Sequence, residues 1–242
     1  MVKEKNVFQK RKYVITYLGS PNNQLQAHAA NGMPVLISFA IAERSKWLRQ
    51  YIPSYTNLLV DSGAYTAHTQ GTTINGPRYV DWCAQWLDTA DNVAGIDSIA
   101  GDYRVSWDNY MQYGGFPTIH DTDPIDFLSD LIDLAQTRGN WLGIGLKPPR
   151  EGKENFIRTV CDQVPDGMHI HGWALRAYSH IPRIDSVDST NWWRDAMDLR
   201  CLPLCKHLTY GETLEIVIKR YARWQPVLKN DPLQTDLFGS NG

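Results

Sequence analysis

LLVDSGAYTAHTQG, residues 58–71, runs from a short apolar segment directly into Asp61, Ser62 and Gly63. An apolar run of this kind, flanked by turn residues, is typical of a buried strand. A serine and a glycine after it let the backbone turn sharply and approach a ligand closely. The stretch therefore predicts a strand whose carboxyl end opens into a functional site.

Similar short runs alternate with amphipathic segments along the whole chain. The predicted strands are residues 12–18, 34–40, 57–61, 93–99, 116–120, 141–146, 168–173 and 184–188. Between them, apolar residues recur at helical spacing, most clearly in segments 79–87, 128–135 and 156–164. Eight strand–helix units in 242 residues predict an α/β protein, a single (β/α)8 barrel over residues 1–228. A doubly wound open sheet is the alternative.

The composition is that of an ordinary globular protein, with 43% hydrophobic residues. A formal net charge of -2 argues against non-specific binding of nucleic acid by the whole molecule. No apolar run reaches the roughly 18–20 residues of a membrane span, and the first residues lack the apolar core of a signal peptide. We therefore expect a cytoplasmic protein without a membrane partner.

Polar residues recur at or just past the carboxyl ends of the predicted strands. They are Asp61, Asp97, His120, Lys147, Trp173 and Asp188. In a barrel these ends meet at one mouth, where barrel active sites lie. Carboxylates held together repel, so one tends to stay protonated while another stays charged, which supplies an acid–base group and a nucleophile. Binding of a hard cation and capping of the following helices are the alternatives.

Four segments resemble motifs of the tRNA-guanine transglycosylase superfamily, in the family's order. VDSGAYT (60–66) resembles the D-S-G-[GA]-[FY] segment at the end of strand three, and IDSVDST (184–190) resembles the strand-eight segment with the nucleophilic Asp. AGIDSIAGD (94–102) falls where the family carries its base-binding Asp. LGIGL (142–146) resembles the glycine-rich strand six. The resemblance covers roughly residues 57–200.

The resemblance implies a role for each matching residue. Asp188 would be the nucleophile that displaces guanine, and Asp61 would be the general acid and base. Asp97 would accept hydrogen bonds from the purine. The other residues implied to contact the base are Ser62, Gly63, Tyr65, His120, Gly143 and Gly145, the two strand-six glycines flanking a backbone contact. His169 and His171 are two residues apart on one strand face, and we expect satisfied structural histidines there, with ligand-binding histidines as the alternative.

The segment after the last predicted strand departs from the family. The tRNA enzymes bind a structural zinc there through three cysteines and a histidine, whereas this chain offers Cys201, Cys205 and His207. These three leave a four-coordinate site one ligand short, unless a distant residue such as His180 completes it. We expect no cofactor for the chemistry, with a structural zinc on these residues as the alternative.

The chain lacks the segments by which the tRNA enzymes recognise tRNA. In this it resembles the smaller, phage-associated DpdA-like DNA transglycosylases. Trp192, Trp193 and Arg194, beside the nucleophile, would then stack on or wedge beside a flipped nucleotide. The alternative is that Trp192 and its neighbour Trp193 pack the last helix. Tyr65 has a similar pair of interpretations, a stacking platform for the base or a core aromatic.

Residues 229–242 are predicted to form a flexible tail. Within it, Gln234, Leu237 and Phe238 resemble the Q-x-x-L-F peptide by which DNA enzymes bind the bacterial sliding clamp. A plain disordered tail is the alternative.

The resemblance as a whole implies an enzyme, a pentosyltransferase that replaces guanine in DNA with a base such as 7-cyano-7-deazaguanine. The reaction would pass through a covalent aspartyl–nucleotide intermediate, in the host cytoplasm if a phage encodes the protein. Three alternatives stay open: the same exchange on tRNA, hydrolysis of a nucleoside or nucleotide by a glycosidase, and a non-catalytic binding subunit.

Overall fold

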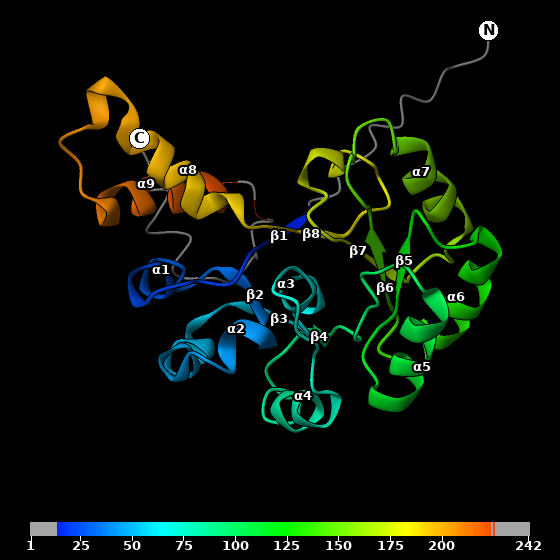
Figure 1. Ribbon diagram of the computed structural model, residues 1–242. Coiled ribbons are helices and arrows are strands. Elements are labelled where there is room, and N and C mark those ends of the chain that lie inside the picture. The colour runs from blue at the N-terminus through cyan, green and yellow to red at the C-terminus, as the bar shows by residue number, and fades with distance from the viewer. Residues whose placement is uncertain (1–13, 224, 226–242) are drawn as a thin grey trace, which may run out of the picture.

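The computed structural model describes residues 14–223 and 225, in which eight parallel strands form one sheet (Figure 1). The order of the strands is β4-β3-β2-β1-β8-β7-β6-β5, so the last strand of the chain pairs with the first. The strands are β1 (Ile15–Leu18), β2 (Pro34–Ser38), β3 (Asn57–Asp61), β4 (Asn92–Val93), β5 (Thr118–His120), β6 (Trp141–Gly145), β7 (His169–Gly172) and β8 (Ser186–Ser189).

A single bridge joins the two edges of this sheet. Ala94, just after β4, pairs in parallel with Phe116, just before β5. The Gly95 N–H donates to the Phe116 carbonyl, and the Phe116 N–H donates to the Val93 carbonyl, both at 2.9 Å. The bridge closes the sheet, which confirms the predicted (β/α)8 barrel and rules out the doubly wound alternative.

Helices cover the outside of the sheet. In the part of the chain that the structure describes they are α1 (Gln24–Ala29), α2 (Phe39–Ala42), α3 (Ala64–Thr69), α4 (Gly76–Cys83), α5 (Tyr103–Tyr113), α6 (Leu128–Gln136), α7 (Glu154–Gln163), α8 (Asn191–Cys201) and α9 (Tyr210–Ala222). Figure 1 shows α5, α6 and α7 beside β5–β7, with α1 and α2 on the other side of the molecule. Between β7 and β8 lies only a 3-10 turn, Arg176–Tyr178. None of the described helices is long and apolar enough to cross a membrane.

The barrel has an aromatic interior and two outer cores. Tyr17, Leu36, Leu59, Ala94 and Phe116 fill the space enclosed by the strands, with Trp141 and Trp173 packed against them. Two larger apolar clusters lie between the sheet and the helices, one around β1–β3 and one around β5–β8. Burial on both faces explains why the strands read as continuous apolar runs. The interior is a packed core and not a pore.

Gly115 allows the two edges of the sheet to meet. Its φ is +83°, and an added Cβ would lie 2.5 Å from the backbone nitrogen of Gly95. Gly115→Ala is therefore expected to lower the free energy of unfolding by about 3 kcal/mol, from backbone strain and overpacking together. Urea denaturation followed by circular dichroism measures this loss.

Gly71→Ala is the matched control for that substitution. Gly71 also has a positive φ, +65°, but nothing lies within 4 Å of the position of an added Cβ. It is expected to cost only the strain, about 1 kcal/mol. Equal losses in the two variants would show that the close approach of residue 115 to the backbone of Gly95 does not affect stability.

Candidate active site

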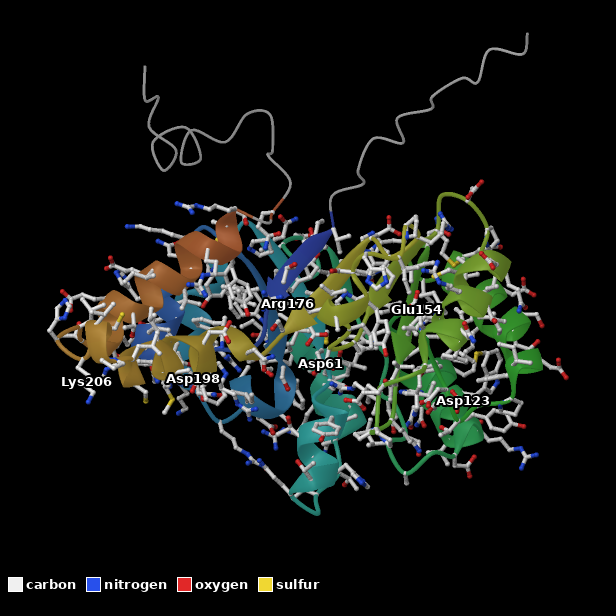
Figure 2. All side chains as sticks on the ribbon, turned by 90° about the horizontal axis from the view of Figure 1, so that it is seen from above. Asp61, Asp123, Glu154, Arg176, Asp198 and Lys206 are labelled. Atoms are coloured by element: carbon white, nitrogen blue, oxygen red, sulfur yellow. The ribbon has the colours of Figure 1, made fainter. Side chains whose placement is uncertain are left out.

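The carboxyl ends of the strands bring together the polar residues predicted from the sequence. Asp61 is the last residue of β3, His120 is the last residue of β5, and Asp188 lies in β8. Asp97 lies in the loop after β4, because β4 ends at Val93 and only a bridge at Ala94 follows, in place of the predicted strand 93–99. Figure 2 shows Asp61 near the middle of the molecule.

The surroundings of Asp61 shift the pKa of its carboxyl group strongly upward. Burial raises the pKa of Asp61 to about 7, and the charges of Asp97 and Asp188 raise it further in the same direction. The backbone N–H of Gly63 donates to its Oδ2 at 3.0 Å, which favours the charged form but does not outweigh burial. At neutral pH this carboxyl group can therefore both accept and donate a proton.

Asp97 and His120 form a second group at the mouth, supported by Tyr110 and Asp123. Tyr110 Oη donates a hydrogen bond to Asp97 Oδ1. His120 lies between two carboxylates, with Nε2 3.6 Å from Asp97 Oδ2 and Nδ1 3.4 Å from Asp123 Oδ2. Burial raises the pKa of Asp97, although His120 and Tyr110 oppose it. Burial alone would lower the pKa of His120, but Asp123 and Asp97 outweigh it, and the net direction is upward.

Asp188 is buried and is held by the backbone of the loop that precedes β8. Its Oδ1 accepts a hydrogen bond of 2.6 Å from the Ala174 N–H. Ala174 has φ +52°, the left-handed region that a non-glycine residue seldom adopts. Strain of this kind persists where the surroundings impose it, and it is concentrated at functional sites. Here it directs the N–H toward the carboxylate.

The two histidines of β7 do not both match the prediction of satisfied structural residues. His169 Nε2 and His171 Nδ1 lie 2.7 and 2.8 Å from the same hydroxyl, Ser186 Oγ. His171 Nε2, although buried, has no hydrogen-bond partner and lies 3.6 Å from Asp188 Oδ1. The prediction is therefore wrong for His171, which faces the candidate site.

The two strand-six glycines make room for side chains of the site and do not face open space. A Cβ on Gly143 would lie 2.5 Å from Trp173 Nε1, which donates to Thr118 Oγ1 at 2.9 Å. A Cβ on Gly145 would lie 2.5 Å from Cδ2 of His120. These contacts explain both glycines without a bound base, and the backbone contact to a base that the resemblance implied stays a prediction.

Packing within the protein accounts for the serine and the glycine in the turn after Asp61. Ser62 is buried, and its Oγ accepts a long hydrogen bond of 3.4 Å from the Ala64 N–H. Gly63 has φ +78°, and an added Cβ would lie 2.6 Å from the Cβ of Ala40. Tyr65, on α3, is 60% exposed, so the core alternative for this residue is wrong.

Trp192 is not available to a nucleic acid. Its side chain is fully buried, and its Nε1 donates to the Gly19 carbonyl at 2.9 Å. The predicted contact with a flipped nucleotide is therefore wrong for Trp192, and the alternative, that it packs the helix, is correct. Arg194 is exposed, with its guanidinium 5.1 Å from the ring centroid of Trp193.

The cysteines do not gather into a metal site. Cys201 and His207 are exposed and Cys205 is partly buried. Within residues 14–223 and 225, no group of three or more His, Cys, Asp or Glu side chains is arranged to hold a metal ion. The predicted ligand set is thus not assembled in this structure. The predicted tail, 229–242, with its clamp-binding peptide, lies outside the described residues.

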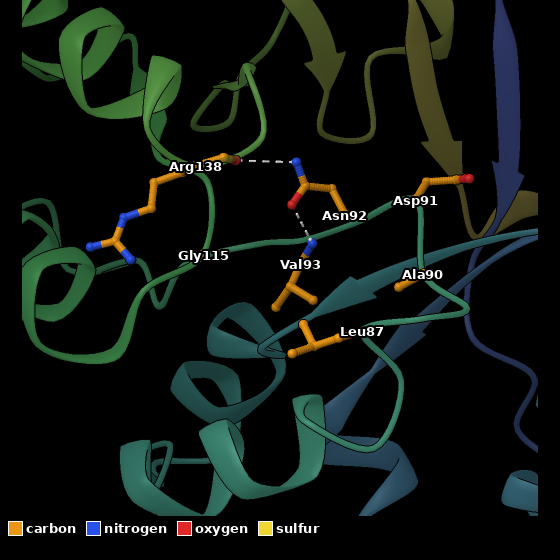
Figure 3. A pocket seen from close by; sticks show the side chains of 7 residues that line it. All are labelled: Leu87, Ala90, Asp91, Asn92, Val93, Gly115 and Arg138. Atoms are coloured by element: carbon orange, nitrogen blue, oxygen red, sulfur yellow. Dashed lines mark hydrogen bonds between the residues drawn. The ribbon is translucent and has the colours of Figure 1, made fainter.

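A pocket lies at the opposite end of the barrel (Figure 3). It is lined by Leu87, Ala90, Asp91, Asn92, Val93, Gly115 and Arg138. Its carboxylate, Asp91, is engaged in holding the structure, because it accepts hydrogen bonds from Tyr17 Oη and Asn57 Nδ2. These residues belong to the amino ends of the strands, where barrel residues serve stability.

Sequence reasoning missed three residues of the mouth: Tyr110, Asp123 and Ala174. Tyr110 lies on a helix, and no local pattern indicates that its hydroxyl reaches Asp97. Asp123 carries a signal that could have been used, because it follows the strand-end residue His120 by three positions and binds its backbone N–H at 2.8 Å.

The chain matches no family model and no curated protein. It is similar to the solved structure of the YdjI aldolase from Escherichia coli K12, with 12% identity, a TM-score of 0.51, and coverage of 96% of this chain and 94% of that chain. It is also similar to a putative fructose-1,6-biphosphate aldolase from Coccidioides immitis, with 9% identity, a TM-score of 0.50, and coverage of 88% and 91%. At such identities the likeness shows the fold alone.

These comparisons correct the function predicted from the sequence. The similar structures, which cover nearly the whole chain, are aldolases, so the predicted exchange of guanine in DNA, with its alternatives on tRNA and on nucleosides, is wrong. The resemblance of four short motifs to the transglycosylase superfamily, and the predicted partners, are not tested by these comparisons and stay predictions.

Proposed function

We propose that this protein is an enzyme of the aldol class, which makes or breaks a carbon–carbon bond next to a carbonyl group. The observation that carries the proposal is Asp61, a carboxyl group at the mouth of a (β/α)8 barrel with a pKa of about 7. Both similar structures named above are of aldolases, which supports this class of reaction. The substrate is a small hydroxycarbonyl compound.

The proton transfers follow from the environment of Asp61. In the cleavage direction, ionised Asp61 accepts the proton of the substrate hydroxyl group. The electron pair of that O–H bond forms the carbonyl of the leaving aldehyde, and the pair of the broken carbon–carbon bond passes to the remaining fragment as an enolate. Protonated Asp61 then returns the proton to the enolate carbon, so that atoms and charge balance.

The positive groups of the mouth stabilise the enolate. Burial lowers the pKa of His120, but Asp123 and Asp97 raise it by more, and this net rise favours the charged form. Lys147 follows β6 at the same end of the barrel, close enough for its charge to act on His120. Fixed positive charges near a developing oxyanion lower the barrier because they need no reorganisation during the reaction.

Proton exchange in D2O tests the proposal. Dihydroxyacetone, dihydroxyacetone phosphate and fructose 1,6-bisphosphate are incubated with the protein, with and without added divalent metal ions. Proton NMR then follows exchange next to the carbonyl of the first two, and release of triose phosphate from the third. We expect exchange above background, and about 10²–10⁴-fold less in Asp61→Asn.

Asp198→Asn is the matched control, because Asp198 is an exposed carboxylate on α8, far from the mouth (Figure 2). It is expected to leave the rate unchanged. If the wild-type protein exchanges none of the three probes, or if Asp61→Asn exchanges them as fast as wild type, the proposal fails.

A further inference from the structure

Two adjacent strands carry a column of polar side chains along the inside of the barrel. His169 and His171 alternate on β7, and Ser186 and Asp188 alternate on β8, so that each pair points to one face. The two strands are neighbours in the sheet (Figure 1). They pair in parallel, with His171 opposite Ser186. His169 begins β7 at the amino end of the barrel, and Asp188 lies near the carboxyl end.

The side chains of this column are in register for hydrogen bonding. Ser186 Oγ lies between the histidines, 2.7 Å from His169 Nε2 and 2.8 Å from His171 Nδ1. The last step is longer, 3.6 Å from His171 Nε2 to Asp188 Oδ1. This distance is longer than a hydrogen bond, so the last step requires the ring and the carboxyl group to approach each other.

His171 is the unusual member of the column. Its ring is fully buried, yet its Nε2 has no hydrogen-bond partner. Trp173 packs edge-on against it at 4.4 Å and Tyr17 at 6.0 Å, so its surroundings are aromatic on these sides. A histidine with a purely structural role would pair both nitrogens, because an unpaired buried polar atom is costly. The unpaired atom faces the carboxylate of the candidate site.

The geometry points to a proton relay, in which His169, Ser186 and His171 connect Asp188 with the amino end of the barrel. The His169 Nε2–H proton passes to Ser186 Oγ, the Ser186 O–H proton to His171 Nδ1, and the His171 Nε2–H proton to Asp188. His171 changes tautomer, Ser186 regains its proton, and His169, which is partly exposed, takes a new proton from solvent. This inference deepens the proposed function and rests on it for proton exchange at the mouth, to which it adds Asp188, whose charge acts on Asp61.

Hydrogen–deuterium exchange of the His171 ring tests the relay. Protein labelled with 15N in its histidines is transferred into D2O at pH 7, and NMR of the ring nitrogens follows the loss of the Nε2 proton. A relay exchanges this proton quickly although the ring is buried. Without a relay, the proton exchanges only when the barrel opens, as slowly as the most protected backbone amides.

Ser186→Ala distinguishes a relay from a purely structural serine, because the two predict opposite changes in the exchange rate of the His171 Nε2 proton. With a relay, loss of the hydroxyl slows exchange at His171 about tenfold or more, and Ser186→Thr restores it. If Ser186 is only structural, Ser186→Ala leaves the rate unchanged or raises it, because the barrel opens more readily. Ser20→Ala is the control: Ser20 is also buried, and its hydroxyl makes two hydrogen bonds near β1 and β2. We expect it not to slow exchange.

A second variant keeps the test decisive if Ser186→Ala does not fold. His169→Gln removes the far ring of the relay and is likewise expected to slow exchange at His171. Slow exchange in the wild-type protein, or no slowing in either variant, overturns the relay. None of these measurements uses a substrate, so failure of the aldol assay and failure of the relay are distinguishable.

Discussion

Asp61→Asn is expected to stabilise the fold while it removes the acid–base group of the proposed reaction. The pKa of Asp61 is about 7 in the folded protein, against about 3.9 in an unfolded chain. Between these two values the folded state binds more protons than the unfolded state, so the free energy of unfolding falls as the pH rises. The destabilisation is absent near pH 4 and complete above pH 7, where the buried carboxyl group is ionised.

The expected size of this effect follows from the gap between the two pKa values. A gap of about three pH units corresponds to about 4 kcal/mol, and partial exposure of Asp61 reduces this to about 2 kcal/mol. Asparagine has the same shape and keeps an oxygen for the Gly63 N–H. Asp61→Asn should therefore raise the free energy of unfolding by about 2 kcal/mol at pH 8, and the melting temperature by about 4–8 °C.

Urea denaturation of both proteins at pH 4, 6 and 8 measures this difference. The gain should be close to zero at pH 4 and should grow with pH until about pH 8. The exposed-carboxylate variant Asp198→Asn should show no such trend. A gain that does not depend on pH would mean that Asp61 is not held in its unfavourable charged form. A site that lowers stability in this way is expected where function requires it.

Trp192→Ala is expected to cost more stability than the other substitutions. The indole is fully buried between α8 and the segment after β1, so its removal leaves a large cavity and an unpaired Gly19 carbonyl. Truncation of a buried tryptophan to alanine lowers the free energy of unfolding by about 3–5 kcal/mol. In a domain of this size the melting temperature should fall by about 10 °C.

Arg194→Ala tests whether the loss of stability in Trp192→Ala comes from the burial of the side chain and not from its position on α8. Arg194 is two residues from Trp192 on the same helix, but it is exposed. Its removal is expected to change the free energy of unfolding by no more than about 0.5 kcal/mol. Differential scanning calorimetry of the two variants gives the comparison. A small loss in Trp192→Ala would contradict the burial of this ring in solution.

The local sequence was sufficient to predict several of the strands and one residue of the candidate site. The apolar runs around residues 34–38, 57–61 and 141–145 predicted strands within one or two residues, because burial on both faces requires continuous apolar side chains. The strand-end position of Asp61 is likewise a local property. A carboxylate directly after such a run, followed by Ser62 and Gly63, is visible without knowledge of any other strand.

Local patterns in the chain are thus enough to predict the alternation of strands and helices and the placement of Asp61, His120 and Asp188 at strand ends. The folded arrangement of the chain sets which partners these residues have. It buried Trp192, brought Tyr110 to Asp97, and put Ser186 between His169 and His171. The physical reason is that burial, desolvation and hydrogen bonding depend on atoms that are close in space but distant in the chain.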